Sequence, residues 1–112
     1  MSKQLGGDGY YQQGDVIIEP WADRPGDAAP AKEKARGLVL AEGEHTGHAH
    51  VLDRVGNIEF MEKDGMFYIK NDKTSTIRHE EHKPVTLPPG QWRVRIVKEY
   101  DHFAEEARAV KD

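Results

Sequence analysis

Apolar residues recur at every second position through much of the middle of the chain, and this period of two predicts β-strands. The clearest case is 91–100, where Trp92, Val94 and Ile96 alternate with other side chains. Runs rich in β-branched and aromatic residues predict further strands at 10–19, 38–41, 48–52, 58–62, 66–70 and 74–78. These short strands, roughly seven or eight with turn signals between them, predict an all-β fold in the form of a small single-domain sandwich or barrel.

Glycine, proline and aspartate mark the turns between these strands. Asp64-Gly65 predicts a tight hairpin turn, because this dipeptide readily adopts the positive φ angles that such turns require. Gly14-Asp15 predicts a bulge or turn within the first strand, which Pro20 ends. The proline-rich segment 84–90 is predicted to be a loop with the character of a type II turn.

The segment 20–36 is the longest predicted loop, since Pro25 and Pro30 prevent a long helix there. Loops of this length are uncommon in compact domains unless they are functional or disordered, and we expect this one to be mobile and on the surface. A chain of 112 residues is expected to form one domain. It divides into a flexible N-terminus, a β domain and a C-terminal tail with a short helical turn, at 1–9, 10–102 and 103–112.

Composition and charge argue against several classes of protein. Lys and Arg number 16 against 20 Asp and Glu, and the net charge of −4 argues against a nucleic-acid partner. The chain has no cysteine, so any metal ligands must be nitrogen or oxygen atoms. No apolar run approaches the roughly 20 residues that span a bilayer, and the N-terminus lacks the apolar core of a signal peptide. We therefore expect a soluble cytoplasmic protein with no membrane partner.

Five of the six histidines fall in two short clusters. His48 and His50 are two residues apart, so on a strand both imidazoles point to the same face. His79 and His82 are three residues apart and would converge on a helical turn or a tight loop. Imidazole is the commonest protein ligand for transition metals, and the two pairs would form one site if they met across a sheet.

The residues around the clusters extend the predicted site. Further ligands, or partners that orient an imidazole, are His45, Glu80, Glu81 and Asp53. A set of imidazoles with a carboxylate suits a divalent transition metal, with zinc as the first candidate and iron, nickel or manganese as the others. Two other roles remain open for the histidines, namely structural hydrogen bonding and catalysis without a metal.

Five segments spread over most of the chain resemble a group of small uncharacterised bacterial and phage-borne proteins. They read QGDV, LAEGE, TGHAH, HEEH and EYD, at 13–16, 40–44, 46–50, 79–82 and 99–101. The resemblance implies that the histidines act as a unit, and it implies no particular activity.

The pair His48-Ala49-His50 and the turn Pro88-Pro89-Gly90 are similar to parts of the two cupin motifs. That resemblance implies a double-stranded β-helix barrel that holds a metal through an HxH pair, a glutamate and a later histidine. The chain departs from the cupin pattern, because Asp53 is the nearest acid after the pair and Arg93 stands where cupins carry histidine. The run 15–42 is also similar to the chaperonin-10 barrel, a family in which histidines have no role.

Two alternatives to a metal-binding protein come from other classes. The first is a structural or interaction module of a phage particle or larger assembly, in which 20–36 and both termini contact a partner or another copy of the chain. The second is a cupin-like small-molecule sensor or isomerase, which needs a cavity lined by Trp92, Phe60 or Phe67. The sequence leaves open whether the protein is an enzyme.

Overall fold

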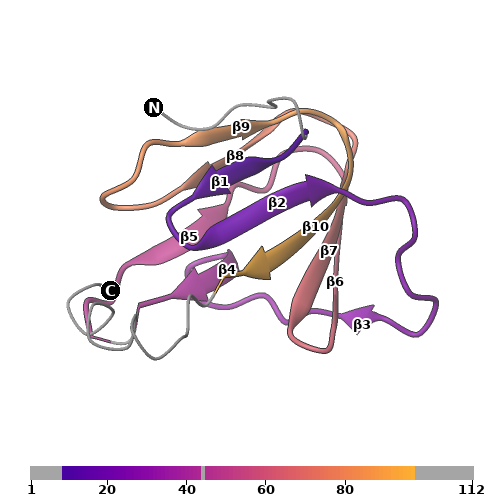
Figure 1. Cartoon of the computed structure of the whole chain (residues 1–112), viewed down its shortest axis with the longest axis horizontal. Coiled ribbons are helices and arrows are strands. Elements are labelled where there is room, and N and C mark those ends of the chain that lie inside the picture. Colours follow the sequence, from indigo (N-terminus) through magenta and orange to yellow (C-terminus); the bar gives the residue numbers. More distant parts are fainter. Residues whose placement is uncertain (1–8, 44, 98–112) are drawn as a thin grey trace.

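The computed structural model describes residues 9–43 and 45–97, which form ten strands and no helix (Figure 1). The prediction of an all-β fold is confirmed. The strands are β1 (Tyr11–Gln13), β2 (Val16–Pro20), β3 (Ala29–Pro30), β4 (Leu38–Glu42), β5 (Ala49–Leu52), β6 (Ile58–Lys63), β7 (Met66–Asn71), β8 (Ser75–Arg78), β9 (Val85–Leu87) and β10 (Gly90–Ile96).

The strands build two antiparallel sheets. The larger sheet has the order β1-β2-β10-β7-β6-β3, and the smaller has the order β4-β5-β8-β9. Their inner faces share one hydrophobic core, to which Ile18 and Val94 contribute from the larger sheet and Leu52 and Ile77 from the smaller. All four side chains are buried. The sheets also approach each other along one edge, where β1 contacts β9.

Two of the predicted turns are confirmed. Asp64 and Gly65 have φ angles of 52° and 80°, and they join β6 to β7 in a tight hairpin with Lys63 opposite Met66. Gly14 has a φ of 58°, which favours glycine, and with Asp15 it forms the turn from β1 to β2.

The prediction of a loop at 84–90 is wrong in part, because this segment contains β9 and the first residue of β10. Val85 and Leu87 are buried while Thr86 between them is exposed, as expected for a strand that pairs with β8. Three residues between prolines carry too little pattern to predict a strand, so pairing decides their conformation.

The loop predicted at 20–36 also contains a strand, because Ala29 and Pro30 of β3 pair with Met61 and Glu62 at the edge of the larger sheet. The structure does not describe 1–8 of the predicted N-terminal segment 1–9, the last residues 98–102 of the predicted β domain, or the predicted C-terminal tail 103–112. The helical turn predicted in this tail therefore lies outside the described part of the chain.

We predict that Asn71→Ala destabilises the fold by about 3 kcal/mol. Asn71 is 3 % exposed, and its Oδ1 accepts hydrogen bonds from the backbone N–H of Gly90 and from Nε1 of Trp92. Its Nδ2 donates to the carbonyls of Lys73 and Pro88. The alanine would leave these buried groups without partners. Urea unfolding measures the loss, and Lys70→Ala at the exposed neighbouring position should change stability by less than about 0.5 kcal/mol.

Candidate metal centre

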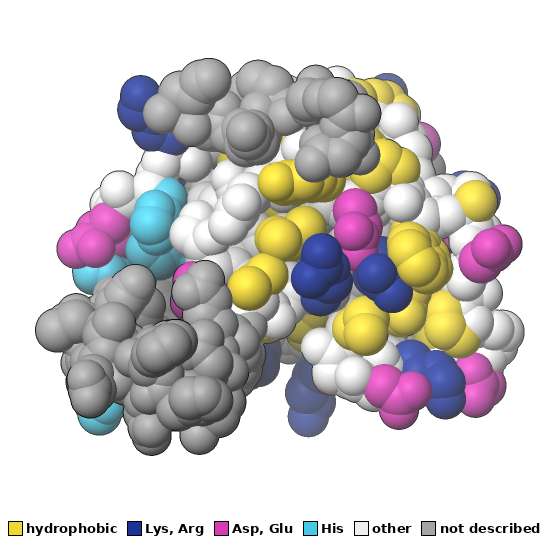
Figure 2. Space-filling model, in the orientation of Figure 1, with side chains coloured by type: hydrophobic (Ala, Val, Ile, Leu, Met, Phe, Trp, Pro, Cys, Tyr) yellow, Lys and Arg dark blue, Asp and Glu magenta, His cyan; other side chains and the backbone are white. Residues whose placement is uncertain are grey.

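The four histidines predicted as ligands lie together in one cluster. His50 is in β5, His48 lies just before that strand, and His79 and His82 lie in the loop between β8 and β9. The ring of His79 is central, since its centroid is 4.3 Å from that of His50, 4.6 Å from that of His82 and 5.5 Å from that of His48. Figure 2 shows histidine side chains gathered on one side of the molecule, away from its larger apolar areas.

Strand pairing explains why the two segments meet. β5 and β8 are antiparallel neighbours, with Leu52 opposite Ile77. The residues that precede β5 therefore lie next to those that follow β8. A hydrogen bond from the backbone N–H of Ala49 to Oε1 of Glu80, at 2.9 Å, joins the two segments directly.

A residue of the larger sheet orients His50. Gln13 of β1 is 3 % exposed, and its Nε2 donates to the backbone carbonyls of Ile77 and Lys83, both at 2.9 Å. These two bonds fix the orientation of the amide, so its Oε1 is the atom that faces Nδ1 of His50 at 2.7 Å. Because a carbonyl oxygen only accepts hydrogen bonds, Nδ1 of His50 carries the proton, and in the neutral ring Nε2 keeps a lone pair.

The cluster holds its central rings in the neutral form. Burial, followed by the nearby rings of His79 and His82, lowers the pKa of His50 to about 4. Burial and the ring of His82 also lower the pKa of His79. Metal ligation requires neutral imidazole, so near pH 7 these two rings are in the protonation state that a metal site needs.

His48 has a buried polar atom whose hydrogen-bonding capacity is unused. Its Nδ1 has no hydrogen-bond partner among the described residues, and Oε2 of Glu81 lies 3.8 Å away. Leaving such an atom buried and unpaired costs free energy, and buried polar groups in native proteins rarely lack a partner. A bound cation would supply the missing interaction.

Glu80 is the carboxylate that groups with two of the histidines in a geometry suited to a metal ion. One ligand atom from each of His48, His79 and Glu80 can be chosen so that all three lie within 4.8 Å of one another, and no such group among the described residues includes His50 or His82. Oε1 of Glu80 accepts the Ala49 hydrogen bond, and Oε2 forms an ion pair with Arg36. Backbone hydrogen bonds, with Arg36 as a smaller cause, lower the pKa of Glu80 to about 2, so this carboxylate is ionised at neutral pH.

Three further candidates were predicted, and within the described part of the chain only Glu81 of these comes near a histidine, with Oε2 at 3.8 Å from Nδ1 of His48. His45 is exposed, and Glu81 is an exposed residue of the β8–β9 loop. Asp53 accepts a hydrogen bond from Nε of Arg78 at 2.9 Å, so its carboxylate is already paired.

Three residues that the sequence analysis did not connect with the histidines contribute to the site, namely Gln13, Arg36 and Gly14. A Cβ atom at position 14 would lie 2.7 Å from Nε2 of His82, and the φ of 58° favours glycine there. The β1–β2 turn thus packs directly against this imidazole. Spacing rules could not find these residues, since each acts on a histidine or glutamate more than 30 residues away.

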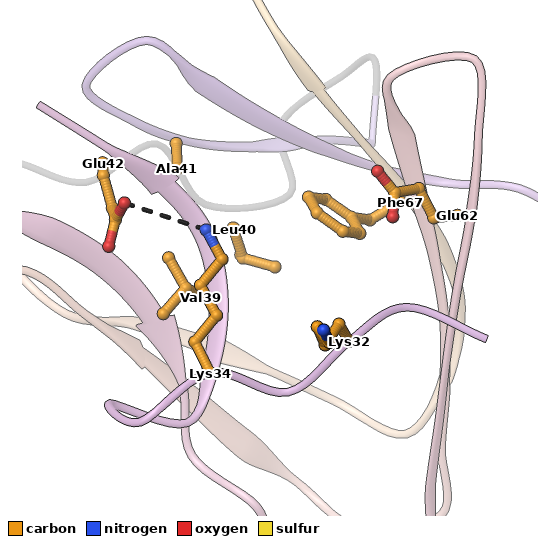
Figure 3. Close-up of a pocket in the computed structure, with 8 residues that line it drawn as sticks. All are labelled: Lys32, Lys34, Val39, Leu40, Ala41, Glu42, Glu62 and Phe67. Carbon is orange, nitrogen blue, oxygen red and sulfur yellow. Dashed lines mark ion pairs between the residues drawn. The ribbon is translucent and has the colours of Figure 1, made fainter. Parts of the chain in front are cut away.

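A separate hollow lies between β4 and the β6–β7 hairpin (Figure 3). Its lining combines Val39, Leu40, Ala41 and Phe67 with Lys32, Lys34, Glu42 and Glu62. Of the three aromatic residues predicted to line a cavity, Phe67 is at this hollow, while Phe60 and Trp92 belong to the core. The positive and negative side chains are equal in number, and Lys34 is paired with Glu42 at 3.8 Å.

Comparison with known proteins identifies a family for most of the chain. Residues 12–97 match the family described as "Domain of unknown function (DUF8820)". No curated protein and no solved structure gives a match. Within 9–43 and 45–97, no helix is long and apolar enough to cross a membrane.

We predict that acid destabilises the metal-free protein through His50. Below the ordinary pKa of 6.5 the unfolded chain takes up a proton that the folded chain, with a pKa of about 4, does not. Stability therefore falls as the pH drops from about 6.5 towards 4. Between pH 7 and pH 5 the wild type should lose about 2 kcal/mol more than His50→Gln, measured by urea unfolding with chelator present. Equal losses in the two proteins would contradict the burial of a neutral His50.

Proposed function

This chain belongs to the family described as "Domain of unknown function (DUF8820)", and we propose from its site that it binds a divalent transition metal ion through clustered histidines. The proposed ligands are His48, His50, His79 and His82, with Glu80 in support. Zinc is the first candidate, and iron, nickel and manganese are the alternatives.

The observation that carries this proposal is the hydrogen bond between His50 and Gln13. Imidazole ligands usually donate their second ring N–H to an oxygen acceptor, which orients the ring and increases its basicity. His50 has this arrangement, with Nδ1 directed at Oε1 of Gln13 and the lone pair of Nε2 available. The rings of His79 and His82 lie beside it, with centroids at 4.3 and 5.8 Å.

Two further observations support the same ligands. Nδ1 of His48 is a buried ring nitrogen with no hydrogen-bond partner among the described residues, and in its unprotonated form its lone pair would bind a cation. Glu80 is held between the two segments by Ala49 and Arg36 in the absence of an ion. The site would thus be partly formed before a metal binds.

We predict that His48→Ala and His50→Ala each abolish stoichiometric zinc binding. Each substitution removes one proposed ligand nitrogen, while His45→Ala, at an exposed neighbouring position, should bind zinc like the wild type. Zinc per chain is measured by elemental analysis of protein purified without a histidine tag. In the wild type, zinc at about 100 times its dissociation constant should add about 2.7 kcal/mol to the free energy of unfolding, and this gain should vanish in both variants.

An unchanged zinc content in the variants at positions 48 and 50 would refute this assignment. Size-exclusion chromatography with and without chelator then tests the alternative of an interaction module. An oligomer that contains no metal and is insensitive to chelator would favour that alternative.

We also predict that Gln13→Leu weakens zinc binding by about 10- to 100-fold, because His50 loses the acceptor that orients it. Gln12→Leu is the matched control, since Gln12 is adjacent and, within the described part of the chain, its amide bonds only the carbonyl of Gly14. Isothermal titration of both variants, after their folding has been verified by circular dichroism, measures the difference. Equal affinities would show that the Gln13 contact serves the fold alone.

A further inference from the structure

Residues 79–82 form a turn, here called the histidine turn. In this turn the imidazole of His79, a proposed metal ligand, also accepts hydrogen bonds from the backbone. We infer that metal binding breaks the internal hydrogen bonds of the histidine turn, so that this turn is the metal-responsive element of the protein. The inference rests on the proposed function and adds to it a conformational consequence.

The hydrogen bonds at issue converge on one ring nitrogen. The backbone N–H groups of Glu81 and His82 point at Nδ1 of His79, at 3.0 and 3.3 Å. A backbone N–H can only donate, so Nδ1 of His79 must accept and cannot carry a proton. In the neutral ring the proton is therefore on Nε2, which is the opposite tautomer from that of His50.

Either mode of ligation by His79 removes this arrangement. A metal at Nδ1 would take the lone pair that the two N–H groups now share. A metal at Nε2 would displace the proton of that nitrogen to Nδ1, which would then direct its own N–H at the two donors. In both cases Glu81 and His82 lose their acceptor, whereas ligation by Nε2 of His50 leaves its bond to Gln13 intact.

The effect would extend beyond the turn through Glu80. This residue lies inside the turn, and it connects to β5 through Ala49 and to Arg36 through the ion pair. Arg36 in turn donates from Nη1 to the carbonyl of Gly47 at 2.6 Å. The ion pair is partly exposed, with 44 % and 38 % of the two side chains accessible, so its rearrangement costs little free energy.

Nuclear magnetic resonance of the ¹⁵N-labelled full chain tests the inference, with zinc alone as the probe. Without zinc, the ring ¹⁵N shifts of His79 should report the tautomer protonated on Nε2. One equivalent of zinc should abolish that tautomer and raise hydrogen exchange of the Glu81 and His82 amides about tenfold or more. The amide of Asp53, bonded to the carbonyl of Thr76 in the β5–β8 pair, is the internal control and should not change.

His79→Ala provides the matched variant. It removes the acceptor, so the amides of Glu81 and His82 should exchange rapidly whether or not zinc is present, in a chain whose other shifts show that it is folded. Zinc binding at one equivalent with both amides and the His79 tautomer unchanged would overturn the inference and leave the proposed function standing. A wild-type chain that binds no zinc would overturn both.

Discussion

The antiparallel pairing of β5 with β8 is the constraint on which the candidate site depends. It sets Leu52 opposite Ile77 and Val51 opposite Arg78, so the segment before β5 and the loop after β8 reach the same end of the smaller sheet. Burial of Leu52 and Ile77 in the core maintains this register. A slip of one residue would turn His50 from the interior to the outer face of the sheet, because side chains alternate between the two faces.

Gln13 links the larger sheet to the same site. Its amide bonds two backbone carbonyls of the β8–β9 region and the imidazole of His50, although it lies in β1. A buried amide needs partners for its polar atoms, and here those partners hold two sheets together. The same side chain selects the tautomer of His50. Fold stability and the readiness of this ring to bind a metal therefore depend on one set of hydrogen bonds.

Charge near the cluster limits which ions the proposed site would prefer. The central rings are neutral, and the carboxylate of Glu80 is already paired with Arg36. Affinity would therefore come from imidazole lone pairs more than from negative charge. Calcium and magnesium prefer several charged oxygen ligands, whereas zinc, nickel and iron accept nitrogen readily. This balance agrees with the transition metals that the side-chain types suggest.

The sequence by itself determined the all-β class, the β6–β7 hairpin and the two histidine pairs, because alternation, the Asp64-Gly65 turn and short spacings are local properties. It did not determine β9, whose three residues become a strand only by pairing with β8. Only the tertiary structure decided that the histidine pairs meet, and that Gln13 and Arg36 join them. Strand order and hydrogen bonds between residues 30 or more positions apart leave no spacing in the chain from which they could be predicted.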